Sequence, residues 1–154
     1  MVLDRKPEQN EELDFLVGTW KLDVKASVTG LPSESQMVGM IYPIHDGIWY
    51  QWDIQSLRRA GRITWICGWN PSKSNFQVYF YDNHGVHGHE SSAGPGWEDD
   101  RLRFTGTMYL PEGEVPVIDE FTRIDEDCFH DDVQIQVGDE WKQILHAECH
   151  RLIV

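Results

Sequence analysis

The sequence consists of short runs of strand-forming residues separated by residues that favour turns. Ten such runs follow one another, and no long stretch shows the apolar spacing of an amphipathic helix. Within the first run, apolar and polar side chains alternate over residues 20–26, which is typical of a strand with one buried face. The runs span residues 18–28, 36–44, 47–57, 62–69, 75–82, 86–92, 101–110, 116–124, 128–137 and 140–153. They predict an all-β fold whose strands follow an antiparallel, up-and-down order.

The residues between the runs support this order. Asp46-Gly47 precedes an alternating segment at 48–55 and is the strongest hairpin signal in the chain. Other turn-forming breaks lie at residues 29–32, 59–61, 70–72, 93–96, 111–113 and 137–139. We find no internal repeat, linker or low-complexity segment, so residues 1–154 are expected to form a single domain.

The two ends of the chain indicate how the sheet closes. Residues 1–17 are charged and polar until an apolar group begins at Leu13, which favours a short helix or turn that plugs one end of the fold. Trp20 opens the first strand and Arg151 lies in the last, so a guanidinium could cover the indole. If these strands pair, the sheet becomes a small barrel, whose interior is filled by side chains or holds one small ligand.

These end motifs resemble those of a known group. The entry Phe15-Leu16-Val17-Gly18-Thr19-Trp20, with Arg151 in the last strand, resembles the calycin group of lipocalin-like barrels. Short bacterial lipocalin-like proteins of poorly defined function share the later pattern: Trp69-Asn70-Pro71, Tyr79-Phe80-Tyr81-Asp82, Asn83-His84-Gly85 and a Gly-rich turn before Arg101-Leu102-Arg103-Phe104. The resemblance implies a barrel with Gly18, Trp20 and Arg151 as its structural signature. It also implies a cup for small, often apolar molecules, in a group that includes carriers, haem-binding barrels and a few enzymes.

Charge and cysteine content exclude several classes of protein. The formal net charge of −13 repels nucleic-acid and membrane phosphates, and the basic residues form no stripe, so neither partner is expected. The three cysteines have no paired-motif spacing and are expected to be reduced thiols in the core. The sequence shows neither a secretory leader pattern nor an apolar run long enough to span a bilayer, so a cytoplasmic location is expected.

Aromatic residues are the first candidates for a binding site. The chain has seven tryptophans, five tyrosines and six phenylalanines, which offer rigid surface to a flat apolar ligand. We expect Tyr50, Trp52, Trp65 and Tyr79 to line the cavity, with His89 and Arg103 as further ligand-binding residues. Alternatively, the rings fill the barrel completely, and the protein acts through its outer face or as a homodimer.

Proton transfer is a second possibility for the same pocket. His87, His130 and Glu120 are the candidate acid–base residues, since burial raises a carboxyl pKa and histidine titrates near neutrality. Asp119 and Glu120 lie on opposite faces of one strand, so only one can enter the barrel. Such an enzyme would be a cofactor-free isomerase or cyclase, for example in natural-product metabolism.

Other histidines raise the question of a metal or haem. His84, His87 and His89 fall at the tip of a predicted hairpin, where solvated histidines are the expected outcome and no metal is predicted. His146 and His150 point away from the interior if Arg151 points toward it, which leaves haem a minor alternative. No nucleophile, nucleotide or dinucleotide motif occurs, and no cofactor is expected. Binding of a small apolar or aromatic metabolite is therefore the leading hypothesis.

Overall fold

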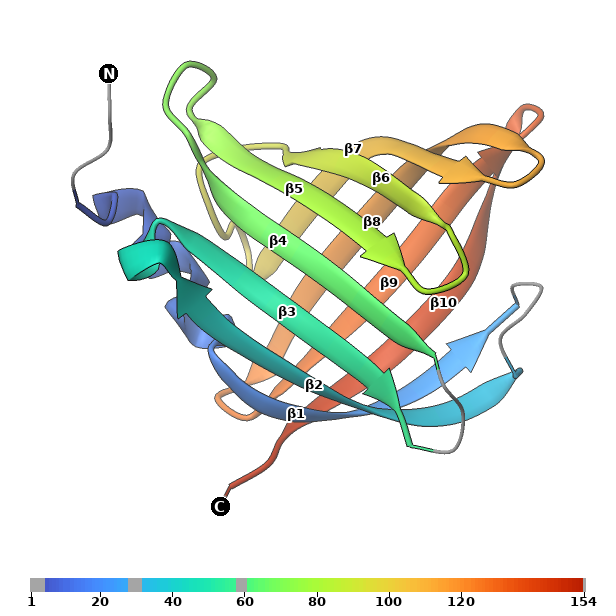
Figure 1. Cartoon of the computed structure of the whole chain (residues 1–154), viewed down its shortest axis with the longest axis horizontal. Coiled ribbons are helices and arrows are strands. Elements are labelled where there is room, and N and C mark those ends of the chain that lie inside the picture. Colours follow the sequence, from blue (N-terminus) through green and yellow to red (C-terminus); the bar gives the residue numbers. More distant parts are fainter. Residues whose placement is uncertain (1–4, 28–31, 58–60, 154) are drawn as a thin grey trace.

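A computed structural model of the chain describes residues 5–27, 32–57 and 61–153. Over these residues, ten antiparallel strands form one closed barrel, in which each strand pairs with its neighbours in sequence and β1 pairs with β10 (Figure 1). The strands are β1 (Gly18–Ala26), β2 (Glu34–Ile44), β3 (Trp49–Ser56), β4 (Arg62–Asn70), β5 (Asn75–Asp82), β6 (His87–Ser92), β7 (Arg101–Leu110), β8 (Gly113–Asp125), β9 (Cys128–Val137) and β10 (Glu140–Arg151). The predicted all-β, up-and-down barrel is confirmed.

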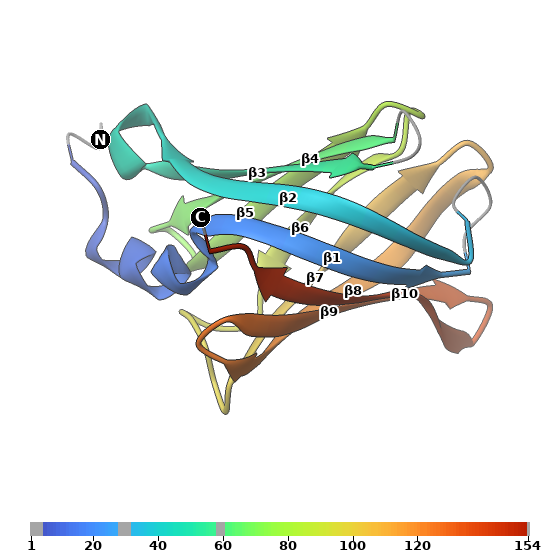
Figure 2. The same cartoon turned by 90° about the horizontal axis from the view of Figure 1, so that it is seen from below.

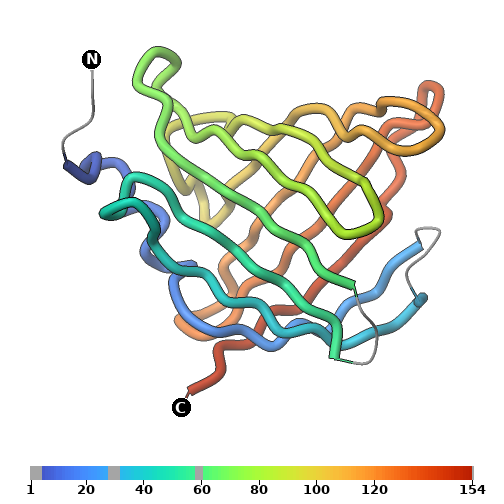
Figure 3. The backbone as a smooth tube through the Cα atoms, in the orientation of Figure 1, coloured from blue at the N-terminus to red at the C-terminus, as the bar shows by residue number. Residues whose placement is uncertain are grey.

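The tube in Figure 3 follows this meander from one hairpin to the next. The expected breaks at 29–31 and 59–60 lie outside the described residues. All three cysteines are buried and form no disulfide, as expected of core thiols. Within the described ranges, no helix has the length and apolar character needed to cross a bilayer. The cytoplasmic location and the homodimer stay predictions.

One end of the barrel is covered by the segment before β1. A 3-10 helix, η1 (Glu8–Leu16), lies across this end in Figure 2, and its Leu13 and Leu16 are buried. The Asn10 side chain donates a hydrogen bond of 2.7 Å to the carbonyl of Gly47, in the short 3-10 turn η2 (His45–Gly47) between β2 and β3. The predicted N-terminal helix or turn is therefore present, and it closes one end of the barrel.

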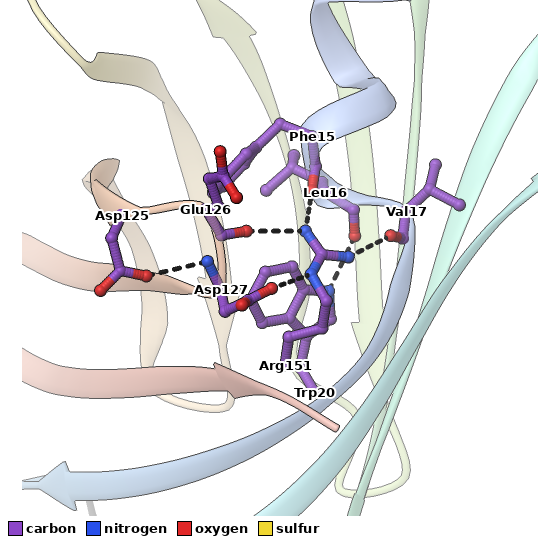
Figure 4. A network of polar contacts seen from close by, with 8 residues as sticks. All are labelled: Phe15, Leu16, Val17, Trp20, Asp125, Glu126, Asp127 and Arg151. Carbon is purple, nitrogen blue, oxygen red and sulfur yellow. Dashed lines mark hydrogen bonds and ion pairs between the residues drawn. The ribbon is translucent and has the colours of Figure 1, made fainter. Parts of the chain in front are cut away.

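Arg151 joins this cover to the barrel wall, as Figure 4 shows. Its guanidinium donates hydrogen bonds to the carbonyls of Val17 at 2.7 Å, Phe15 at 2.9 Å and Glu126 at 3.2 Å. It also pairs with the Asp127 carboxylate at 3.1 Å and lies 4.2 Å from the centre of the Trp20 ring. Because one side chain satisfies carbonyls from two chain segments, Arg151 fixes η1 against the end of the sheet.

Gly18 makes room for this arrangement. Its φ of +144° is one that side-chain-bearing residues rarely adopt, and a Cβ there would lie 2.7 Å from an Arg151 guanidinium nitrogen. Glycine is therefore required by both the backbone and the neighbouring side chain. Together with the β1–β10 register that pairs Trp20 with Arg151, this accounts for the Gly18, Trp20 and Arg151 signature.

Burial of the inward-facing residues divides the barrel into two halves. Near η1, in what we call the closed half, most inward residues are buried and many are aromatic, with Trp20 and Phe129 in an edge-to-face contact at 4.7 Å. At the other end, the open half, inward residues of the same strands are only half-buried, as at Val133 and Ile135 on β9. Because these side chains share a face with buried Phe129, their exposure shows that solvent reaches the interior from this end.

We predict that Arg151→Lys destabilises the fold by about 2–4 kcal/mol, because lysine keeps the charge but loses the fork that contacts several acceptors. Arg101→Lys is the control, since Arg101 is exposed and makes one long ion pair of 3.9 Å with Glu120. This control should change stability by less than about 0.5 kcal/mol. Urea unfolding measures both, and equal stability of the Arg151 variant and the wild type would contradict the assigned role.

Candidate functional site

Three acidic side chains lie on the inner face of the barrel between its closed and open halves. They are Glu90 on β6, Asp119 on β8 and Asp131 on β9, and we call them the carboxyl cluster. Their residues are only 2%, 8% and 9% exposed. In register, Asp119 lies opposite Phe104 and Val133, while Asp131 lies opposite Phe121 and Ala147. The sheet therefore holds the acids among apolar residues.

The carboxyl cluster has no cationic partner. Over the described ranges, every lysine and arginine residue is exposed or only half-buried, and none forms an ion pair with these three acids. One oxygen of each acid, Glu90 Oε2, Asp119 Oδ1 and Asp131 Oδ1, has no hydrogen-bond partner among those residues. Buried acids without partners cost folding free energy, so a purely structural interior would be more stable without them.

The environment raises the pKa of all three acids. Burial is the main cause for Glu90, and the charge of Asp119 adds to it, while the nearby Trp65 indole lowers the pKa slightly. Burial and the Asp119 charge raise the pKa of Asp131 well above its usual range. Burial also raises the pKa of Asp119, although a hydrogen bond from Asp131 lowers it. Asp131 is thus the member that keeps its proton and donates to Asp119.

A set of carboxyls that share protons in a dry site can act in two ways. It can accept a cationic or hydrogen-bonding group of a ligand, or it can exchange a proton with a bound molecule. The interior thiols offer no comparable chemistry, because burial raises the pKa of Cys67 and Cys149 and keeps both thiols protonated. The carboxyl cluster is therefore the candidate functional site.

The open half supplies apolar walls beside this cluster. Leu145 on β10 and Phe80 on β5 pack against the core while remaining half-buried. Further half-buried residues on inner-face positions of this half include Ala26, Ser35, Ile54, Ile63, Met108, Val115, Val133 and Ile135. The interior thus combines an apolar wall reached by solvent with an acidic group at its base.

Three of the predicted wall residues do face the interior. Tyr50 is buried, and its hydroxyl donates a hydrogen bond of 2.8 Å to Asp14, which places it at the cover formed by η1. Trp52 and Trp65 are buried and meet edge-to-face at 5.8 Å. A Cβ at position 39 would lie 2.4 Å from the Trp52 indole nitrogen, so Gly39 on β2 provides the space for this ring. Of these three, Trp65 lies beside the carboxyl cluster.

The remaining predicted ligand-binding residues lie on the outer face and do not line the interior. Tyr79 is 50% exposed, because β5 turns Phe76 and Val78 inward. His89 points outward on β6, where its ring contacts the Tyr109 hydroxyl at 3.3 Å. Arg103 is exposed on β7, in register with Glu120.

The predicted acid–base residues also point outward. Glu120 is on the outer face of β8 because the alternation that buries Phe121 turns Asp119 inward, so Asp119 is the acid that enters the barrel. His87 stacks on Tyr109 at 5.0 Å on the outer surface. His130 lies on the outer face of β9, between buried Phe129 and Asp131. An acid–base role inside the barrel therefore falls to other residues.

Haem also lacks a suitable histidine inside the barrel. Every histidine on a described strand, including His146 and His150 on β10, occupies an outward position, while Ala147 and Cys149 take the inward ones. An axial imidazole is therefore not available from the inner face of the described strands. The sequence argument that orients His146 and His150 outward is confirmed by the β1–β10 register.

The carboxyl cluster was partly visible in the sequence. On β9, residues 129, 131, 133 and 135 form an apolar alternating face that contains one acid, Asp131. Asp119 likewise stands between Val117 and Phe121. Glu90 had no such signal, because its neighbours on the same face are Gly88 and Ser92. A Cβ on Gly106 of β7 would lie 2.7 Å from the Glu90 Cα, so only the folded sheet shows how tightly this acid is enclosed.

We predict that Glu90→Gln removes a pH-dependent loss of stability. The folded-state pKa of Glu90 is raised. The contribution of this residue to the free energy of unfolding is therefore fully present below the unfolded pKa of about 4.3, and it is lost as pH rises toward the folded pKa. Wild type and variant should be equally stable near pH 4. The variant should gain up to about 1.4 kcal/mol per pH unit above this. Denaturant unfolding across this pH range measures the difference, with outer-face Glu120→Gln as the control. If the stabilities of wild type and Glu90→Gln changed with pH in the same way, the burial of an ionisable Glu90 would be contradicted.

Comparisons with known proteins support the fold and leave the function open. No protein-family model and no curated protein matches the chain. The crystal structure of Rv2717c from M. tuberculosis is similar, with a TM-score of 0.74 and 16% identity over 96% of this chain and 99% of that one. A protein of unknown function from the DUF3598 family of Nostoc punctiforme aligns over 95% of this chain and 100% of its own at 8% identity, with a TM-score of only 0.27. The likeness to Rv2717c shows a shared barrel fold, and the lipocalin placement stays a prediction.

Proposed function

We propose that this protein binds a small, mainly apolar molecule with a basic nitrogen in the open half of the barrel. The apolar body lies against the half-buried inner residues, and the nitrogen meets the carboxyl cluster. The observation that carries this proposal is the presence of three buried acids, each with one unpaired oxygen and none with a cationic partner, at the base of an apolar interior that solvent reaches.

The charge of the ligand follows from what the site lacks. Taking a carboxylate out of water is unfavourable, and here no lysine or arginine of the described chain compensates it. A protonated amine supplies the missing positive charge and donates hydrogen bonds to the unpaired oxygens. An anionic ligand would instead add repulsion, so the same apolar body should bind better as an amine than as an acid.

The apolar part of the ligand follows from the walls. Ligand sites combine mainly hydrophobic lining with a few polar groups that fix orientation. Val133 on β9 and Leu145 on β10 are paired in register near the carboxyl cluster, and both are half-buried. Filling this space removes further apolar surface from water, which contributes roughly 25 cal/mol per Å².

We predict that 4-phenylbutylamine binds at least 10-fold more tightly than 4-phenylbutyrate, which has a similar apolar body and the opposite charge. Trp65 lies beside the carboxyl cluster, so quenching of tryptophan fluorescence should follow occupancy. Titration at one pH and ionic strength gives the two dissociation constants. Failure of both compounds to quench saturably, or a preference for the carboxylate, would contradict the proposal.

Two pairs of variants locate this binding. Glu90→Gln should reduce the preference for the amine, whereas Glu120→Gln, on the outer face, should leave it unchanged. Val133→Trp should fill the open half and weaken binding of both compounds, while Gln134→Trp adds the same ring to an adjacent outward position. Equal effects within either pair would place the ligand outside the barrel.

Proton transfer is a second candidate function, favoured by the coupling of Asp119 to Asp131. Two carboxyls that share a proton can take one from a substrate and return it, which suits a cofactor-free isomerase or cyclase. In such an enzyme, the carboxyl cluster replaces His87, His130 and Glu120 as the acid–base group.

We predict that the barrel accelerates the Kemp elimination of 5-nitrobenzisoxazole, a probe of carboxylate bases in apolar sites. The base takes the C3 proton as the N–O bond breaks and a phenolate forms. The rate should rise with pH as the cluster loses its protons, and Asp119→Asn should abolish the rise. Glu120→Gln is the control. Absence of any protein-dependent rate, or an equal loss in the control, would count against catalysis and leave binding unaffected.

A further inference from the structure

The outer face of β9 and β10 carries a compact group of histidines and carboxylates that the barrel interior does not use. In register, His130 lies opposite Glu148, and Asp132 lies opposite His146. These four outward residues, which we call the outer patch, therefore form a square on two neighbouring strands, with each histidine diagonal to the other. On each strand the two members are two positions apart, His130 and Asp132 on β9 and His146 and Glu148 on β10, so alternation places them on the same face.

Three members of the outer patch converge on one point. One ligand atom from each of His130, His146 and Glu148 lies within 4.8 Å of the other two. The imidazole rings of the two histidines are 5.1 Å apart and nearly perpendicular, at 77°. The Nε2 atom of His146 is 3.9 Å from a carboxylate oxygen of Glu148. Two imidazoles and one carboxylate thus face the same small volume.

Asp132 orients one of these ligands. Its Oδ1 atom lies 2.6 Å from His146 Nδ1, and the same oxygen accepts a hydrogen bond of 2.7 Å from Gln143. An imidazole that donates Nδ1–H to a carboxylate has its Nε2 lone pair free, and this is how proteins commonly orient a metal-binding histidine. The free Nε2 of His146 is the atom that faces Glu148.

From this geometry we propose that the outer patch binds a divalent transition-metal ion of the zinc type, with His130, His146 and Glu148 as ligands and Asp132 as the positioning residue. Ligand atoms on one tetrahedral zinc ion lie about 3.4 Å apart. Small side-chain rotations that move each ligand atom by about 1 Å therefore bring the three together. Imidazole and carboxylate together suit zinc and its neighbours better than calcium or magnesium, which prefer oxygen ligands.

The fourth coordination position is open to solvent. His146 and Glu148 line a hollow on the outer face that continues over β1 and β2, with Asp23, Lys25 and Gln36 in its wall. Three protein ligands and one open position are the arrangement in which zinc holds water or an exchangeable ligand. The site is separate from the carboxyl cluster, because the outer patch lies on the outer face of the barrel wall and the carboxyl cluster on the inner face.

Isothermal titration of the full, tag-free chain with zinc chloride tests this proposal. We expect one zinc ion per chain and at least a 10-fold loss of affinity in His146→Ala and in Glu148→Gln. His87→Ala is the matched control, since His87 is an outward strand histidine outside the outer patch, and it should bind as the wild type does. Absence of zinc binding in the wild type, or equal loss in the control, would overturn the proposal.

The role of Asp132 has its own test. Asp132→Asn keeps the shape of the side chain but removes its charge, and loss of such a partner weakens metal binding by about 10- to 100-fold. With cobalt(II) in place of zinc, the visible absorption reports the ligand set directly. We expect a cobalt spectrum in the wild type that is weakened in Asp132→Asn and lost in His146→Ala. An unchanged spectrum in His146→Ala would exclude this ligand set, and circular dichroism confirms that each variant is folded.

Discussion

Closure of the sheet between β1 and β10 is the constraint on which the rest of this structure depends. It removes both sheet edges, and it brings Arg151 beside Trp20 and the carbonyls that end η1. One end of the barrel is covered in this way, while inward residues at the other end, such as Val133 and Ile135, are only half-buried. The carboxyl cluster can then be desolvated without being sealed off, which is the condition for its raised pKa values.

The fold could be predicted from the sequence because its signals are local. The alternation of side chains and the turn residues around it place β5 at 75–82, β7 at 101–110 and β9 at 128–137, as the structure has them. The start of β8 differs, at Gly113 in place of 116, because the strand continues through Pro116 at an exposed outward position. Proline is tolerated there without breaking the pairing with β7.

The site was harder to predict, since it depends on which face of each strand is turned inward. On β5 the apolar face of Phe76 and Val78 is the inner one, and this excludes Tyr79 from the interior. Asp131 follows from the same rule, because it interrupts an apolar face. Glu90 does not, since both faces of β6 are polar or small, and only the closed barrel decides that Glu90 points inward.

The position of the carboxyl cluster between the two halves reconciles stability with access. In the closed half, edge-to-face packing of Trp20, Phe129 and Phe121 offsets the cost of burying unpaired acids nearby. A carboxyl deeper in that half would be out of reach of any ligand, and one at the rim would be hydrated and keep its ordinary pKa. Only at the boundary does one acid meet a low-dielectric environment on one side and an approaching molecule on the other. The proposed function therefore depends on this boundary more than on any single residue.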